Sequence, residues 1–183
     1  MRIVAGKYKR TPLVSLEGEI TRPTKDMVKE ALFDALQVSE NESFLDLFSG
    51  SGAIGIEAIS RGLNPVILND NNRDAVKIIE TNLKKINEVT RVLNLDYKEC
   101  IFKVKDIKFN YIFVDPPYAF NEYDNVFKLI DEYNILKDEG IIILEVKNTT
   151  ILNDLYFNFF KYKEKKYGIS KLLYYKKEGN ING

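Results

Sequence analysis

Between residues 43 and 146 the sequence repeats one pattern, in which an apolar run is followed by a turn and an amphipathic helix. The apolar runs are nearly continuous, which is typical of parallel strands covered on both faces. Strands are predicted at 44–48, 65–69, 89–95, 110–114 and 140–146, and helices at 54–60, 72–86, 97–104 and 122–133. Right-handed crossovers between such units build a doubly wound α/β sheet of the Rossmann-like kind.

The segment before this repeat predicts a small N-terminal addition to the sheet. Residues 2–16 alternate poorly and contain Gly6 and Pro12, which favours a short hairpin or arm. A helix is then predicted through Gln37, with apolar residues at helical spacing and Thr24 as its N-cap.

The C-terminal part predicts two further strands, at 155–160 and 169–175, joined by a Lys-rich loop. The expected sheet is therefore mostly parallel and has about seven strands. With 183 residues, 45% of them hydrophobic, the chain is long enough for one well-buried domain and short for two. We expect residues 1–23 to form the arm and residues 24–183 the Rossmann-like core.

The composition excludes several kinds of site. The sequence has no histidine, which removes the commonest general base and the commonest metal ligand. Cys100 is the only cysteine, so neither an intrachain disulfide nor a CxxC metal site can form, and we expect no metal. The sequence lacks both a long apolar run and a signal-peptide core, which predicts a cytoplasmic protein without a membrane segment.

Charge is distributed unevenly although the net charge is zero. Residues 1–30 carry seven basic and four acidic side chains, and residues 161–177 carry seven lysines and one glutamate. Residues 31–160 carry 13 basic and 21 acidic side chains. Basic ends around an acidic middle suit a polyanionic partner such as a nucleic acid, but a solvated Lys-rich surface explains the same pattern equally well.

A glycine-rich turn follows the first predicted strand. Gly50, Gly52 and Gly55 spell GxGxxG, which by itself is a weak signal for a dinucleotide site. Asp46 lies four residues before the first glycine, where its carboxylate could hold a positively charged ammonium but would repel a pyrophosphate. The candidate cofactor-binding residues in this turn are Asp46, Phe48, Ser49, Gly50, Ser51 and Gly52.

Two more acids follow the next strands. Asp70 ends the second strand, 18 residues after Gly52, at the spacing expected of a carboxylate that grips the ribose hydroxyls of a cofactor. Asn71, beside it, is a further candidate. Asp96 follows the third strand and could accept a hydrogen bond from an adenine amino group, or could simply cap the helix that begins at Tyr97.

The strongest functional motif is Asp115-Pro116-Pro117-Tyr118, directly after the fourth predicted strand. Two successive prolines fix the backbone and hold a carboxylate, a free carbonyl and an aromatic ring at the carboxyl end of a strand, where α/β sheets bind ligands. The carboxylate and the Pro116 carbonyl could accept hydrogen bonds from an amino group, and the ring could stack on a base. The motif resembles the catalytic tetrapeptide of S-adenosylmethionine-dependent amino-methyltransferases.

Four segments of the chain resemble segments of the bacterial RsmD family and follow the same order as in that family. They are residues 1–8, 21–24, 45–52 and 114–118. The resemblance covers most of residues 1–146. It implies a class I methyltransferase that uses S-adenosyl-L-methionine to methylate the N2 amine of one guanine, guanine 966, in 16S ribosomal RNA, free or in an assembling small subunit. Similar enzymes usually have Glu where this chain has Asp70, and the Lys-rich C-terminal segment matches the family poorly.

Arg22 and Thr24 form part of a compact Thr-Arg-Pro-Thr turn before a helix N-terminus, a place that suits a carboxylate or a phosphate. We expect them at the methionine end of the cofactor or along the RNA entrance, although an ordinary capped helix start has the same sequence.

Three other functions remain open: an amino-methyltransferase acting on another RNA or on DNA, a non-catalytic RNA-assembly factor, and an NAD-type dehydrogenase.

Overall fold

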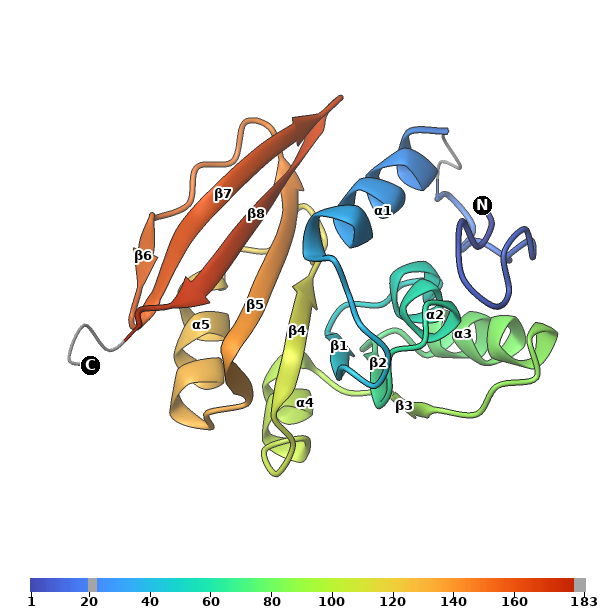
Figure 1. Ribbon diagram of the computed structural model, residues 1–183, viewed down its shortest axis with the longest axis horizontal. Helices are drawn as coiled ribbons and strands as arrows, with labels where there is room; N and C mark the ends of the chain where they lie inside the picture. Colours follow the sequence, from blue (N-terminus) through green and yellow to red (C-terminus); the bar gives the residue numbers. More distant parts are fainter. Residues whose placement is uncertain (20–22, 180–183) are drawn as a thin grey trace.

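The computed structural model describes residues 1–19 and 23–179, which form helices packed on one mixed sheet (Figure 1). The strand order is β3-β2-β1-β4-β5-β8-β7-β6. The helices are α1 (Pro23–Leu36), α2 (Ala53–Ser60), α3 (Arg73–Lys85), α4 (Tyr97–Lys103) and α5 (Tyr123–Glu132). The strands are β1 (Phe44–Asp46), β2 (Val66–Asn69), β3 (Arg91–Leu93), β4 (Phe109–Val114), β5 (Leu136–Lys147), β6 (Leu155–Tyr156), β7 (Phe159–Tyr167) and β8 (Ser170–Lys177).

The first five strands are parallel, and helices cover both faces of this half of the sheet. Successive side chains of a strand point to opposite faces, so Phe44 and Leu45 belong to two separate cores. Phe44 packs with apolar residues of α1, α2 and α3, whereas Leu45 packs with those of α4 and α5. The predicted doubly wound, mostly parallel α/β fold is therefore confirmed.

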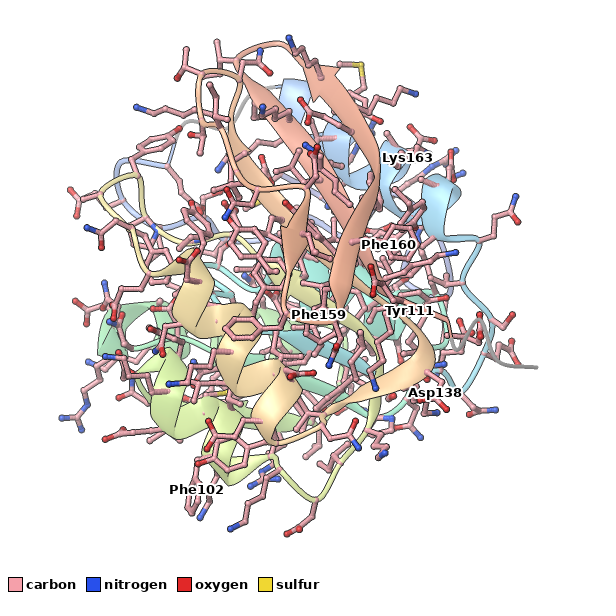
Figure 2. All side chains as sticks on the ribbon, turned by 90° about the vertical axis from the view of Figure 1, so that its left-hand side faces the viewer. Phe102, Tyr111, Asp138, Phe159, Phe160 and Lys163 are labelled. Atoms are coloured by element: carbon pink, nitrogen blue, oxygen red, sulfur yellow. The ribbon has the colours of Figure 1, made fainter. Side chains whose placement is uncertain are left out.

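The C-terminal prediction was wrong in one respect, because the Lys-rich segment is a strand and not a loop. Strand β7 pairs antiparallel with β8, opposing Lys163 to Tyr174, and the sheet has eight strands instead of seven. Figure 2 shows β7 with Lys163 labelled on it. The segment lacks an apolar pattern because most of its side chains are exposed, and the Lys163 ammonium lies 5.2 Å from the centre of the Tyr174 ring.

Two element boundaries also differ from prediction. Helix α1 begins at Pro23, so Thr24 lies within the helix and is not its N-cap. The helix ends at Leu36 because Gln37 has a positive φ of 49°, which an α-helix does not accommodate. Strand β5 begins at Leu136 rather than Gly140, with an irregular register against β4 near its start.

The N-terminal residues form the predicted hairpin-like arm. Arg2 and Pro12 make an antiparallel bridge, and the Ile3 amide donates to the Thr11 carbonyl at 2.9 Å. The arm crosses the end of α2, where Gly6 lies so close to the Ser60 carbonyl that a Cβ atom would clash with it.

No helix within residues 1–19 and 23–179 is long and apolar enough to cross a lipid bilayer.

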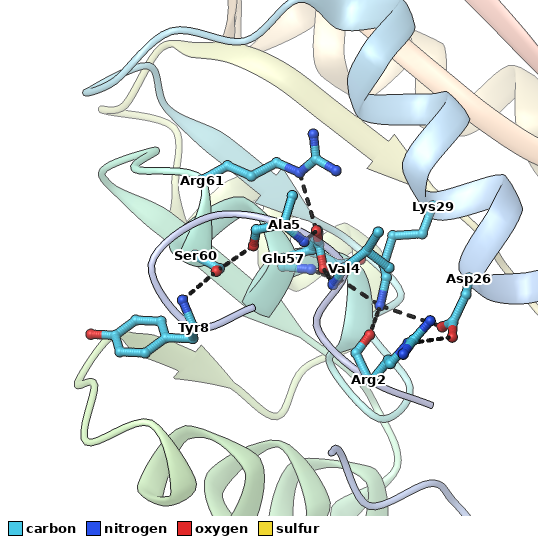
Figure 3. A network of polar contacts seen from close by, with 11 residues as sticks. Arg2, Val4, Ala5, Tyr8, Asp26, Lys29, Glu57, Ser60 and Arg61 are labelled. Carbon is cyan, nitrogen blue, oxygen red and sulfur yellow. Dashed lines mark hydrogen bonds and ion pairs between the residues drawn. The ribbon is translucent and has the colours of Figure 1, made fainter. Parts of the chain in front are cut away.

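A buried carboxylate attaches this arm to helices α1 and α2 (Figure 3). The Glu57 side chain on α2 is fully buried and accepts hydrogen bonds from the Val4 and Ala5 amides, each at 2.9 Å. Its charge is balanced by Lys29 on α1, with an N···O distance of 3.5 Å, and by Arg61, at 3.1 Å. The arm, α1 and α2 are thus held together through one acidic side chain.

Candidate active site

A cleft of about 730 Å³ lies at the carboxyl ends of the parallel strands, and a smaller pocket of about 80 Å³ adjoins it. Ligands bind at this edge in open α/β sheets. The cleft brings together ten predicted residues: Phe48, Ser49, Gly50, Asp70, Asn71, Asp96, Asp115, Pro116, Pro117 and Tyr118. Asp46 and Ser51 line the smaller pocket, which shares Phe48, Ser49 and Asp115 with the cleft. Gly52 lines neither and serves packing, because an added Cβ would lie 3.1 Å from Ile79.

Asp46 ends β1 with one carboxylate oxygen held and the other free. Its Oδ2 accepts the Gly55 amide at 3.0 Å, whereas its Oδ1 is buried with no hydrogen-bond partner among the described residues. Burial raises the pKa of this carboxyl to about 7. A buried oxygen without a partner fits a cationic group such as the ammonium of the methionine portion of a cofactor.

Asp70 is held in place at the end of β2. Its Oδ2 accepts the Gly50 amide at 2.9 Å and its Oδ1 accepts the Asn72 amide at 2.9 Å. These bonds couple the carboxylate to the glycine turn and fix its orientation beside the cleft. The predicted grip on two ribose hydroxyls remains a prediction, and the structure is compatible with it because each carboxylate oxygen can accept more than one hydrogen bond.

Asp96 has the capping role that the sequence left open. Its carboxylate accepts the Lys98 amide at 2.9 Å, at the N-terminus of α4. The same residue lines the cleft, so capping does not exclude contact with a ligand. Its predicted hydrogen bond with an adenine amino group stays a prediction.

The Asp-Pro-Pro-Tyr turn follows β4 directly, as predicted. The Pro117 carbonyl accepts the Phe120 amide at 2.9 Å and closes the turn, while Asp115 faces the cleft. The pKa of Asp115 is raised well above its usual value by the enclosing protein, and then by the negative charges of Glu145 and Asp46. The carboxyl is reachable by solvent in the open cleft, which moderates this rise.

Tyr118 stands at the mouth of the cleft with 78% of its side chain exposed. The ammonium of Lys147, from the end of β5, lies 4.1 Å from the centre of its ring. An exposed aromatic ring beside a cation suits stacking on a nucleic-acid base next to a phosphate.

Several cleft residues were missed by the sequence analysis. An aromatic wall of the cleft combines the predicted Phe48 with three residues that were not predicted, Tyr97, Phe120 and Tyr123. Neighbouring ring centres in this wall lie 5.1–5.9 Å apart. The remaining missed residues include Glu19, Lys25, Glu145, Lys147 and Ser170. The position of Glu145 at the carboxyl end of a predicted strand was the available signal, because the same argument had already selected Asp46, Asp70 and Asp115.

The structure does not test the predicted contacts of two residues. Arg22 lies outside the described residues, as does the side chain of Thr24. Lys25, which follows them, lines the cleft and makes an ion pair with Glu19 at 3.8 Å. Among the described residues, no group of three or more acidic or cysteine side chains is arranged to hold a metal ion.

Comparison with known proteins extends over nearly the whole chain. The family model described as "Conserved hypothetical protein 95" matches residues 1–176. The chain is 33% identical to "Putative rRNA methyltransferase YlbH" of Bacillus subtilis, over 98% of this chain and 100% of that protein. It is 29% identical to "Ribosomal RNA small subunit methyltransferase D" of Escherichia coli K12, over 97% and 90% of the two chains.

The fold has a close counterpart among solved structures. The structure titled "Putative methyltransferase yhhF from Escherichia coli" superposes with a TM-score of 0.81 and 29% identity, over 98% of this chain and 99% of that chain. The family match includes the N-terminal arm, the glycine turn and the Asp-Pro-Pro-Tyr turn, which are the segments that suggested the resemblance. This chain therefore belongs to the RsmD family, whose model carries the description conserved hypothetical protein 95.

Proposed function

We propose that this protein uses S-adenosyl-L-methionine to methylate the exocyclic N2 amine of a guanine in 16S ribosomal RNA. The observation that carries the proposal is a single cleft that combines the glycine turn, Asp70 and Asp115. The relatives named ribosomal RNA small subunit methyltransferase D support ribosomal RNA as the substrate. The target at guanine 966 rests on the family resemblance alone.

The cofactor would lie along the ends of β1, β2 and β3. Asp46 would hold its ammonium, Asp70 its ribose hydroxyls and Asp96 its adenine amine. The aromatic wall formed by Phe48, Tyr97 and Phe120 offers apolar surface in the same cleft. When bound, the cofactor supplies a methyl group on a positively charged sulfur.

The residues of the Asp-Pro-Pro-Tyr turn would act on the target amine. The lone pair of the guanine amine is delocalised into the ring, so the nitrogen is a poor nucleophile. Hydrogen bonds from its two hydrogens to the Asp115 carboxylate and the Pro116 carbonyl would favour a more pyramidal nitrogen and fix its line of approach. After the nitrogen gains the methyl group, its surplus proton can pass to Asp115, whose raised pKa makes it a better acceptor.

Tyr118 would hold the target base outside its stack. Enzymes that act on a base within paired RNA must extract it, and they stack it on an aromatic side chain. The exposure of the Tyr118 ring leaves it available for this contact. Lys147 beside the ring adds positive charge where the RNA backbone would enter the cleft.

The relatives favour this reading over the alternatives. An amino-methyltransferase for another RNA or for DNA would share every cofactor residue, but the relatives from Bacillus subtilis, Haemophilus influenzae and Escherichia coli are named for ribosomal RNA. A dehydrogenase is disfavoured because Asp46 would repel a pyrophosphate.

We further infer a single domain, with residues 1–23 as its arm, that acts in the cytoplasm on ribosomal RNA, either free or in an assembling subunit.

Calorimetry with the purified protein should show binding of S-adenosyl-L-methionine and none of NAD. The Asp70→Ala variant should weaken this binding by about 1–3 kcal/mol, because the ribose hydroxyls lose a charged hydrogen-bond partner. Asp74→Ala, which removes an exposed carboxylate nearby on α3, is the matched control and should leave the affinity unchanged. Tight binding of NAD, or full affinity in Asp70→Ala, would contradict the assignment.

Cofactor affinity should increase with pH up to neutrality. The folded protein disfavours the ionised form of Asp46, whose pKa is about 7, whereas a bound ammonium requires that form. Between about pH 6 and pH 7 the affinity should therefore rise roughly fivefold, with proton release on binding. Calorimetry in two buffers of different ionisation enthalpy measures both effects. Asp46→Asn should bind weakly and without this pH dependence, and a flat profile in the unmodified protein would refute the role of Asp46.

A further inference from the structure

Glu145 occupies the position on β5 that corresponds to Asp115 at the end of β4. Val114 and Leu144 are paired in the parallel register, so the residues that follow them lie side by side, with Cα atoms about 5 Å apart. Val114 and Leu144 both point into the core beneath α4 and α5. Because side chains alternate along a strand, Asp115 and Glu145 share the opposite face, and both line the cleft and the smaller pocket.

This pair of carboxylates is not explained by packing within the chain. Neither Asp115 nor Glu145 forms an ion pair with a described residue. Enclosure by the protein raises the pKa of Glu145, although the positive charge of Lys25 and the Ser170 hydroxyl both favour its ionised form. Enclosure by the protein, and then repulsion between the two neighbouring carboxylates, raises the pKa of Asp115, and groups perturbed in this way are characteristic of ligand sites.

The chemistry of the nucleobases gives the second carboxylate a specific partner. In guanine the exocyclic amine lies next to a ring N1–H, which is a hydrogen-bond donor. In adenine and cytosine the exocyclic amine lies next to a ring nitrogen that carries a lone pair and is an acceptor. Two adjacent carboxylates therefore complement guanine, whereas with either other base one carboxylate would face a lone pair.

We propose that Glu145 is the specificity-determining residue of this site, accepting a hydrogen bond from the N1–H of the target guanine while Asp115 accepts one from the N2 amine. The inference rests on the proposed function and adds the reason why guanine is selected. The Asp-Pro-Pro-Tyr turn by itself recognises an exocyclic amine of any base. Glu145 distinguishes a protonated ring nitrogen beside that amine, as in guanine, from an unprotonated one, as in adenine and cytosine.

The proposal is tested with small-subunit RNA that carries either guanine or 2-aminopurine at the modified position. The analogue keeps the N2 amine but has an unprotonated N1. The unmodified protein should favour guanine by about 10²–10⁴-fold in kcat/KM, because a site built to accept a hydrogen bond rejects a base that lacks the donor. Equal rates on both RNAs would overturn the proposal, and this comparison needs no variant.

Glu145→Gln should change the preference and not only the rate. Its amide can donate a hydrogen bond to the N1 of 2-aminopurine, so the ratio of the two substrates should fall to within about tenfold. Cofactor affinity should stay within about threefold of that of the unmodified protein, which shows that the variant is folded. A variant that binds cofactor and keeps the full guanine preference would overturn the proposal.

The pH profile tests whether the charge of Glu145 acts on Asp115 during the reaction. The groups that raise the pKa of Asp115 include Glu145, Asp46 and Glu19, whereas Lys25 lowers it. Removing the charge of Glu145 should therefore move the acid limb of the rate profile on guanine RNA to lower pH. An unshifted limb contradicts the proposal. Failure of the unmodified protein to methylate guanine RNA at all would refute the proposed function instead, so the two failures are distinguishable.

Discussion

Asp115→Ala should lose methyl transfer by on the order of 10²–10³-fold or more while it still binds S-adenosyl-L-methionine with an affinity within about threefold of normal. The loss is expected because the target amine would no longer be polarised and positioned. The affinity should survive because Asp46, the glycine turn and Asp70 lie on β1 and β2, whereas Asp115 follows β4. Single-turnover methylation and cofactor titration on the same preparation measure the two quantities.

Tyr118 provides the matched controls for this experiment. Tyr118→Phe keeps the stacking face and should retain substantial activity, whereas Tyr118→Ala should lose roughly 1–3 kcal/mol of transition-state stabilisation. If the turn served only to shape the edge of the sheet, all three variants would lose thermal stability and activity together. A well-folded Asp115→Ala protein that methylates RNA at a near-normal rate would end this account of the turn.

Glu57→Ala should be the most damaging single change to stability, with a loss of about 3–5 kcal/mol and a fall in Tm of roughly 6–20 °C. The substitution leaves the Lys29 ammonium, which is only 2% exposed, without its main counter-charge, and leaves the Val4 and Ala5 amides without their acceptor. Thermal and urea unfolding measure this loss.

Two further variants distinguish charge from shape in this network (Figure 3). Glu57→Gln keeps an acceptor for one amide and should lose less stability than Glu57→Ala. Glu80→Ala, at an exposed position on α3, removes a carboxylate without disturbing a buried group and should change Tm by no more than a few degrees. Equal effects of Glu57→Ala and Glu80→Ala would show that the buried network does not hold the arm.

The parallel half of the fold was predictable because its strands and helices are locally consistent. Every predicted element between residues 43 and 146 has a counterpart in the structure, within a few residues at each end. The glycine turn and the strand ends were identified by the same pattern. Strand β7 was missed because its lysines are stabilised by pairing with β8 and by contact with tyrosine rings, and neither is visible in a local sequence window.

The candidate site was predictable where residues follow a strand in sequence and harder where tertiary packing assembles it. Asp46, Asp70 and Asp115 were found because each lies at the end of a parallel strand, and Glu145 was overlooked although it lies near the carboxyl end of β5. Phe120, in the turn that precedes α5, and Tyr123, the first residue of α5, reach the cleft only through tertiary packing. The capping role of Asp96 was one of two readings that its local sequence offered, whereas the free oxygen of Asp46 depends on geometry that the sequence does not encode locally.

Mapping methylated guanines by mass spectrometry in 16S ribosomal RNA tests the central claim most directly. Cells that lack this protein should lose one N2-methylguanine, and its return should require the intact protein and fail with Asp115→Ala. An unchanged set of methylated guanines in the deletion strain, or full restoration by Asp115→Ala, would contradict the account.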